Sequence, residues 1–189
     1  MEQYRLEGKT FVIDDYDRKP AFSSFLPGLA GVKGIPMWTF YTNRGQGMNS
    51  FGIDNKGNAI MEFNTANIAF ENCTVKGFRT FVRVDGQYYE PFFGYNDDAK
   101  RQIRMNKNSF KVIERNEAMG IEVKVNYFIL PNESIGALVR QVSVKNISGK
   151  AMDIEVIDGL PKIITSGINN SEFKELSNLF KSWAYIKNI

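Results

Sequence analysis

The stretch FYTNRGQGMNSFG (residues 40–52) places Arg44 among glycines directly after an aromatic run, and this composition could hold an anion. Glycines let backbone N–H groups approach a phosphate, and an arginine pairs with it. The spacing does not match a phosphate loop, because a dinucleotide fingerprint needs a third glycine where Ser50 stands and a P-loop ends in Gly-Lys-Ser/Thr. The stretch therefore favours a glycine-rich β-turn or bulge, with the residues after Gly47 continuing into the strand of a hairpin.

Sugar binding is the second chemistry open to this stretch. Trp and Tyr rings stack on the apolar faces of pyranose rings, while Arg, Asn and Gln side chains bond hydroxyl groups. The candidate sugar-binding residues are therefore Trp38, Tyr41, Arg44, Gln46 and Asn49. Core packing competes for the aromatic members, because alternate positions of a strand face opposite ways and Trp38 and Tyr41 cannot both point to one side.

The chain contains no histidine, which excludes Ser-His-Asp and Cys-His nucleophiles and His-ligated zinc within these residues. The acidic pairs Asp14-Asp15 and Asp97-Asp98 are expected in solvated turns, because adjacent residues on an extended chain point apart. A glycosidase instead holds two carboxyl groups roughly 5 to 9.5 Å apart across its substrate. The lone Cys73 excludes an intrachain disulfide and is expected in the core. We therefore assign no catalytic residue, no metal ligand and no cofactor.

Charge is scattered along the chain, with 24 basic and 21 acidic side chains giving a net charge of +3. No Lys/Arg block is present to neutralise a row of phosphates, so nucleic acid is not an expected partner. The N-terminal MEQYRLEGKT lacks the apolar core of a signal peptide, and no apolar run approaches the about 20 residues that span a bilayer. The sequence predicts a soluble, cytoplasmic protein without a membrane partner.

Three arginines lie in strand-like segments. Arg140 shares one strand face with Leu138 and Val142, so it is predicted to lean inward and to need a partner, most simply in a structural ion pair. Arg79 and Arg83 alternate with apolar residues and are predicted to lie on a solvated face.

Period-2 alternation is the main structural pattern. It runs through residues 121–129, with Phe128 as the exception, and recurs in residues 137–146 and 152–156, which predicts a meander of antiparallel strands. Asp85-Gly86 separates two β-rich runs, as in a type I′ hairpin, and a second hairpin is predicted to turn at DNKG. The 15 Phe and 8 Tyr residues also suit strands.

These short strands, with no long helical pattern between them, predict an all-β fold with a large antiparallel β-sandwich over residues 1–168. Residues 169–189 differ, because Asn169 and Glu172 have the spacing of a capping box and begin an amphipathic helix. Its apolar stripe comprises Phe173, Leu176, Phe180 and Trp183. The stripe is expected to pack either on the sandwich or on a partner outside this chain.

Three segments, taken in order and spacing, resemble a known family. They are FSSFLPGLAGVKGIPMWTFYTNRGQGMNSFGIDNKGNAIMEF, GFRTFVRVDGQYYEPFF and FILPNESIGALVRQVSVKNISGKAMDIEV. Together they resemble the N-terminal domain of the cellobiose phosphorylase-like enzymes, glycoside hydrolase family 94, formerly glycosyltransferase family 36. The similarity runs from about Phe22 to about Trp183, and its most telling part is ESIGALVRQVSVKNISGK, a strand, a turn and a return strand.

The resemblance implies a galactose-mutarotase-like supersandwich followed, in the family, by linker helices, a helical (α/α)₆ barrel and a small β-domain. The barrel carries the general acid and most of the phosphate site for inverting phosphorolysis of β-glucosides. Inorganic phosphate is then a co-substrate of the parent enzyme, and residues 169–189 begin the linker to the absent barrel. This chain would be non-catalytic, supporting a homodimer and the wall of a pocket for a β-glucoside or oligosaccharide. Two alternatives stay open, a free-standing carbohydrate-binding module and a purely structural interaction domain.

Overall fold

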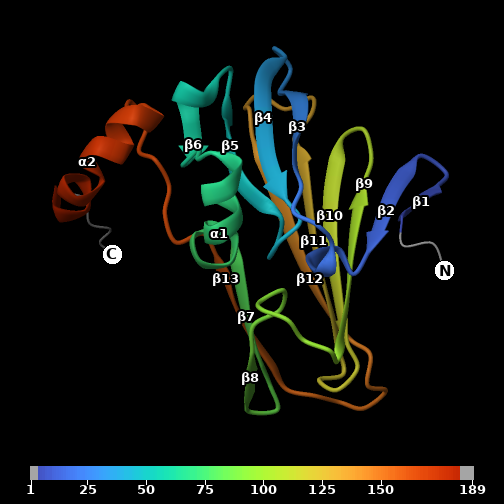
Figure 1. Ribbon diagram of the computed structural model, residues 1–189. Coiled ribbons are helices and arrows are strands. Elements are labelled where there is room, and N and C mark those ends of the chain that lie inside the picture. The colour runs from blue at the N-terminus through green and yellow to red at the C-terminus, as the bar shows by residue number, and fades with distance from the viewer. Residues whose placement is uncertain (1–3, 184–189) are drawn as a thin grey trace.

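The computed structural model describes residues 4–183, and within the last helix it omits the side chains of residues 177 and 180–183. The described residues form a mostly β fold of three antiparallel sheets with six, four and three strands, joined by two α-helices and short 3₁₀ turns (Figure 1). The prediction of a β-rich antiparallel protein is confirmed at this level.

The largest sheet forms one layer of the molecule. Its strands lie in the order β1-β2-β9-β10-β11-β12, and each neighbouring pair is antiparallel. Their bounds are β1 (Tyr4–Glu7), β2 (Thr10–Asp14), β9 (Ala99–Met105), β10 (Ser109–Asn116), β11 (Ile121–Ile129) and β12 (Leu138–Asn146).

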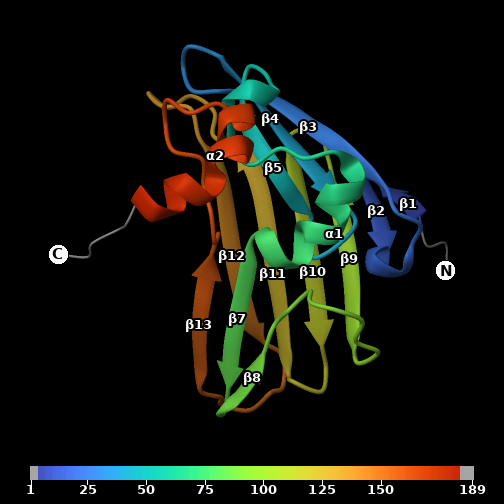
Figure 2. The same cartoon turned by 60° about the vertical axis from the view of Figure 1, so that its left-hand side comes forward.

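Two smaller sheets lie against one face of the large sheet (Figure 2). The four-stranded sheet has the order β3-β4-β5-β6, with β3 (Ser23–Ala30), β4 (Ile35–Thr42), β5 (Met48–Ile53) and β6 (Ala59–Met61). The three-stranded sheet has the order β13-β7-β8, with β7 (Arg79–Val84), β8 (Gln87–Tyr89) and β13 (Ile154–Gly159). Two 3₁₀ turns, η1 (Tyr16–Arg18) and η2 (Lys56–Asn58), complete the β part.

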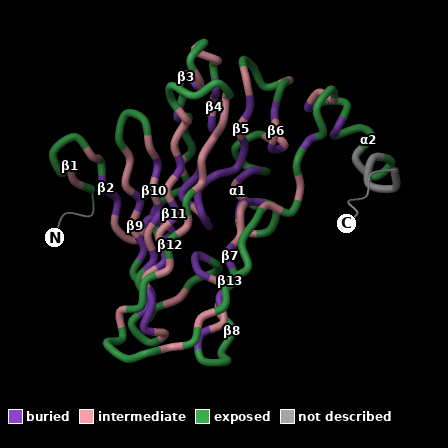
Figure 3. The backbone as a smooth tube through the Cα atoms, turned by 180° about the vertical axis from the view of Figure 1, so that it is seen from behind, coloured by how far each residue is buried: buried purple, intermediate pink, exposed green. Residues whose placement is uncertain are grey.

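The core lies between these layers, where Figure 3 shows the buried stretches of the strands. Along β11 the residues Ile121, Val123, Val125 and Tyr127 are buried and face side chains from both smaller sheets, while the residues between them are partly exposed. Phe128 lies among these partly exposed positions. The predicted alternation on β11 is confirmed. It arises because only one face of the large sheet is covered.

Both predicted hairpin turns are confirmed. Asp85 and Gly86 have φ values of 47° and 85° and connect β7 to β8, whose nearest paired residues are Val84 and Gln87. The DNKG segment connects β5 to β6 through η2, with Asp54 at a φ of 58°.

The expectation that no helix interrupts the strands is wrong. Helix α1 (Ala66–Lys76) lies between β6 and β7 and buries only Ala69 and Cys73, one helical turn apart. Such a narrow, small-residue face produces little of the apolar periodicity by which a helix is recognised in a sequence.

Helix α2 (Asn170–Trp183) begins with the predicted capping box. The Asn169 side chain accepts hydrogen bonds from the N–H groups of Ser171 and Glu172, and the Asn169 N–H donates to Glu172 Oε2 at 3.1 Å. Phe173 is buried against Ala59 and Ile164, so the first turn packs on the sheet side of the molecule.

The rest of the apolar stripe is less covered. Leu176 and its neighbour Leu179 are exposed. The side chains of Phe180 and Trp183, and the predicted continuation through residues 184–189, lie outside the described residues. No helix in the described part of the chain has the length and apolarity to cross a membrane.

Candidate functional site

The glycine-rich stretch is the hairpin between β4 and β5, as predicted. The Thr42 N–H donates to the Gly47 carbonyl at 2.9 Å, and the Gly47 N–H donates to the Arg44 carbonyl at 2.9 Å. Gly45 and Gly47 have φ values of 53° and 82°, and the register shifts between Phe40 and Tyr41. The positive φ values explain the glycines without invoking a bound anion.

The five candidate sugar-binding residues do not form one surface. Tyr41 is buried in the core, where its ring lies 4.5 Å from that of Phe110 and its hydroxyl donates to Met105 Sδ. Trp38 lies on the opposite face of β4, half-buried, and its indole N–H donates to the Asn55 carbonyl at 3.2 Å. The prediction that these two rings point apart is confirmed.

The polar candidates are bonded within the protein. The Arg44 guanidinium donates to the carbonyls of Asn43 and Lys19 at 2.8 and 3.1 Å, and its Cζ lies 4.5 Å from the ring centroid of Phe70. Gln46 and Asn49 are both buried. Their amide groups donate to Thr80 Oγ1 and Thr42 Oγ1, respectively. A sugar-binding role for the five residues stays a prediction.

Arg140 has the partners that its position on β12 required. It pairs with Asp158 on β13 and donates to Gln46, to Thr80 Oγ1 at 3.2 Å and to the Tyr127 hydroxyl at 3.3 Å. Burial raises the pKa of Tyr127, against the opposing effect of the Arg140 charge. This cluster connects the glycine-rich hairpin to the three-stranded sheet and to the large sheet.

The other charged residues singled out in the sequence lie near the surface. Arg79 and Arg83 are partly exposed and ion-paired, with Glu90 and Glu155, so they are not simply solvated. Asp97 and Asp98 are exposed in a turn, as predicted. Asp14 instead ends β2 and pairs with Arg5, and Asp15 alone is the turn residue, with a φ of 48°.

A buried ionic cluster was not predicted. Arg101 on β9 is 3% exposed, and it bonds Glu114 Oε2 on β10 at 2.7 Å and Asp17 Oδ2 at 2.8 Å. Its remaining donors reach the carbonyls of Phe93 and Gly94. Burial by itself lowers the pKa of Arg101, but Glu114, Tyr16 and Asp17 together outweigh this effect and the pKa is raised.

Glu114 is equally well bonded. It is 1% exposed and also accepts hydrogen bonds from the Phe92 N–H at 2.6 Å and from the Tyr89 hydroxyl. Arg101, Glu114 and Asp17 are all hydrogen-bonded to other protein groups. The cluster therefore attaches η1 and the 90–98 loop to the large sheet.

Cys73 is buried on α1, as expected of a core residue, and its thiol donates to the Arg44 carbonyl at 2.9 Å. Burial raises the pKa of this thiol to about 11. The ordinary cysteine pKa is about 8.5. The stability that the neutral buried thiol provides is therefore fully present below about pH 8.5, and it is lost as the pH rises toward the pKa of Cys73 in the folded chain.

We expect Cys73 in the folded chain to resist Ellman's reagent at pH 8, because the thiolate is the reactive form and the thiol is enclosed. Addition of guanidinium chloride should release one reactive thiol per chain, and Cys73→Ala should release none. Stoichiometric labelling of the folded chain at pH 8, as fast as that of the unfolded chain, would contradict this assignment.

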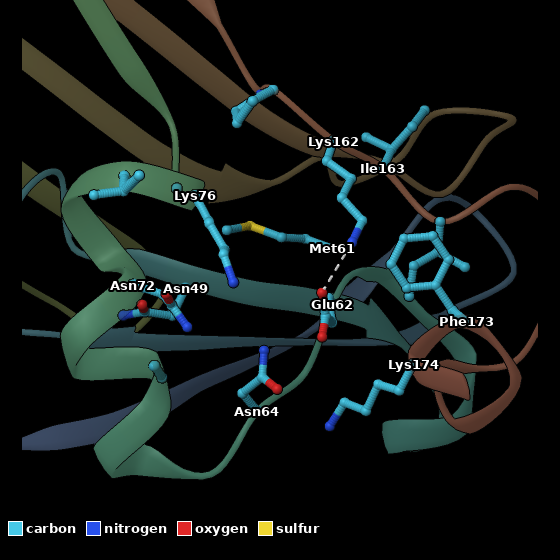
Figure 4. Close-up of a pocket in the computed structure, with 15 residues that line it drawn as sticks. Asn49, Met61, Glu62, Asn64, Asn72, Lys76, Lys162, Ile163, Phe173 and Lys174 are labelled. Atoms are coloured by element: carbon cyan, nitrogen blue, oxygen red, sulfur yellow. Dashed lines mark hydrogen bonds and ion pairs between the residues drawn. The ribbon is translucent and has the colours of Figure 1, made fainter. Parts of the chain in front are cut away.

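The clearest candidate binding site is a pocket of about 590 Å³ (Figure 4). Its walls come from β5, from β6 and the residues after it, from α1, from the 161–164 segment and from the N-terminal part of α2. The Asn170 side chain fixes α2 beside this pocket, because it accepts from the Phe63 N–H at 2.8 Å and donates to the Phe63 carbonyl at 3.1 Å.

The lining of this pocket is rich in ammonium and amide groups. Lys162 Nζ lies 3.3 Å from Glu62 Oε2 and 4.1 Å from the ring centroid of Phe173. Lys76 and Lys174 add two further positive charges, and the amides are Asn49, Asn64 and Asn72. Such groups bond hydroxyls and anions.

Sequence reasoning found Asn49 of this set and missed the others, because two distant parts of the chain, residues 61–77 and 161–174, supply them. Within residues 4–183, no group of three or more His, Cys, Asp or Glu side chains is arranged to hold a metal ion. Comparison of the chain with protein-family models and with curated proteins gave no match.

Proposed function

We propose that this chain is the N-terminal, non-catalytic domain of a cytoplasmic bacterial inverting glycoside phosphorylase acting on β-glucosides of the cellobiose or β-glucan type. The domain supports a homodimer and the wall of the sugar pocket, while the barrel of the parent enzyme performs the chemistry with inorganic phosphate. The sequence resemblance supports the family, and the antiparallel layers are compatible with the galactose-mutarotase-like supersandwich that the family implies.

The observation that carries the proposal is an uncovered apolar face on the four-stranded sheet. Phe25 is 50% exposed and Leu29 66% exposed, and the Phe25 ring lies 6.3 Å from that of Trp38. Exposed apolar patches on soluble proteins mark surfaces that another molecule or domain covers. A barrel domain or a second copy of the chain would cover this face, and the exposed leucines of α2 would pack in the same way.

One observation favours the carbohydrate-binding module as the second candidate. Two shallow hollows of about 440 and 390 Å³ share Trp38 as a lining residue, one beside Pro27 and Pro36 and the other beside Phe25 and Phe63. An indole face between two hollows suits stacking on a pyranose ring.

The test uses the chain as it stands. Incubated with inorganic phosphate and cellobiose or longer β-glucans, it should release no glucose 1-phosphate, and release would contradict the non-catalytic assignment. In sedimentation, Phe25→Glu with Leu29→Glu should shift a dimer to monomer, because two charges would enter the apolar face.

The matched control is Tyr88→Glu, which places a charge at another exposed aromatic, on the β7–β8 hairpin, and should leave the dimer unchanged. A monomer that binds cello-oligosaccharides and loses them on Trp38→Ala would instead favour the carbohydrate-binding module. A dimer without any sugar response would favour the purely structural interaction domain.

A further inference from the structure

The pocket between α1 and α2 is lined by two exposed lysines that no described residue neutralises. Lys76 ends α1 and Lys174 is the fifth residue of α2, and neither makes an ion pair or hydrogen bond within the described part of the chain. The third lysine, Lys162, is paired with Glu62, the acidic residue of the lining. The lining therefore carries an excess of two positive charges.

Two amides complete the polar wall. In Figure 4, Asn72 lies with Lys76 on the α1 side, Lys174 lies on the α2 side, and Asn64 lies between the two lysines. The side chains of Asn64 and Asn72 make no hydrogen bond to other described residues, so their donors and acceptors are available to a ligand. The ring of Phe173 adds an apolar surface at the edge of the pocket.

We propose that this pocket binds a phosphate monoester of a sugar or similar small polyol. A phosphate monoester carries a charge of about −1.5 to −2 at neutral pH, which matches the two unpaired lysines. Lysine binds phosphate as a point charge, and the amides provide the donors and acceptors that hydroxyl groups require. The volume of about 590 Å³ lies within the range of small-molecule pockets.

The proposal is independent of the phosphorylase assignment, because it depends on the pocket lining and not on the apolar sheet face. Inorganic phosphate shares the negative charge but lacks the hydroxyl groups of the sugar or polyol, so binding of the two ligands can be distinguished. Replacing an amide should weaken binding of the ester and leave binding of inorganic phosphate unchanged.

The test is isothermal titration of the chain with glucose 1-phosphate and glucose 6-phosphate, with glucose and inorganic phosphate as comparison ligands. At least one ester should bind with a submillimolar Kd, inorganic phosphate more weakly, and glucose not measurably. Lys76→Gln and Lys174→Gln should each weaken ester binding at least about tenfold, because each removes a charge-assisted contact. Asn64→Ala should weaken binding of the ester alone.

The matched control is Lys145→Gln, the same change of charge at an exposed position of β12 that lies opposite Glu122 of β11 in the strand register. It should leave binding unchanged, and thermal melts should show all variants folded. Absence of ester binding at about 10 mM by the folded chain overturns the proposal. Equal weakening by Lys145→Gln, undiminished binding by a variant that combines Lys76→Gln with Lys174→Gln, or equal affinity for inorganic phosphate overturns it as well.

Discussion

Replacing Arg101 with methionine is expected to lower the free energy of unfolding by about 3 to 5 kcal/mol, because it breaks a buried ion pair from one side. The variant leaves the carboxylates of Glu114 and Asp17 enclosed without their cation, and it removes the donors that hold the Phe93 and Gly94 carbonyls. Urea denaturation followed by circular dichroism measures the loss.

The matched control is Arg104→Met on the same strand. Arg104 also pairs with a glutamate, Glu7, but its side chain is 30% exposed, so water takes over the interaction when the arginine is removed. The change should be much smaller than at Arg101. Similar losses at the two positions would show that the Arg101 cluster contributes no more than a surface pair.

A double-mutant cycle separates pairing from packing at this site. Arg101→Met combined with Glu114→Gln should cost less than the sum of the two single changes, because each single variant strands a charge that the double variant no longer contains. Additive losses would assign the effect to packing of the two side chains.

Local sequence patterns predicted those parts of the fold that local chemistry determines. The β11 strand has one buried face, and its apolar residues therefore alternate with polar ones. The turn at Asp85-Gly86 needs two positive φ values, which those residue types accept. Helix α1 was not predicted because its buried residues are two small ones, Ala69 and Cys73.

The buried ionic cluster and the pocket were not predicted, for two different reasons. The same alternation argument that placed Arg140 inward applies to Arg101, since Ala99 and Ile103 on its strand are also buried, so this signal was present in the sequence. The pocket is different, because Lys76 and Lys174 are separated by about half of the chain and no motif connects them. Only the packing of α1 against β4 and β5, and of Phe173 of α2 against Ala59 of β6, brings them together.

The second large effect is expected at the glycine-rich hairpin, where Gly47→Ala should lower the free energy of unfolding by about 2 to 5 kcal/mol. Gly47 has a φ of 82°, and a Cβ there would lie 2.4 Å from Cε1 and 2.5 Å from Cζ of Phe110. Phe110 is itself enclosed by Tyr41 and Tyr127, so its ring has little room to move. The hairpin glycine thus serves core packing.

Gly86→Ala separates the two causes of this loss. Its φ is 85°, close to that of Gly47, but nothing lies within 4 Å of a Cβ built there, so it should show the backbone penalty alone, about 1 to 2 kcal/mol. Denaturation midpoints of both variants measure the difference, and adding Phe110→Leu should recover part of the Gly47→Ala loss. Equal losses of stability at the two glycines would mean that only the backbone conformation matters. The contact with the Phe110 ring would then not explain why position 47 is a glycine.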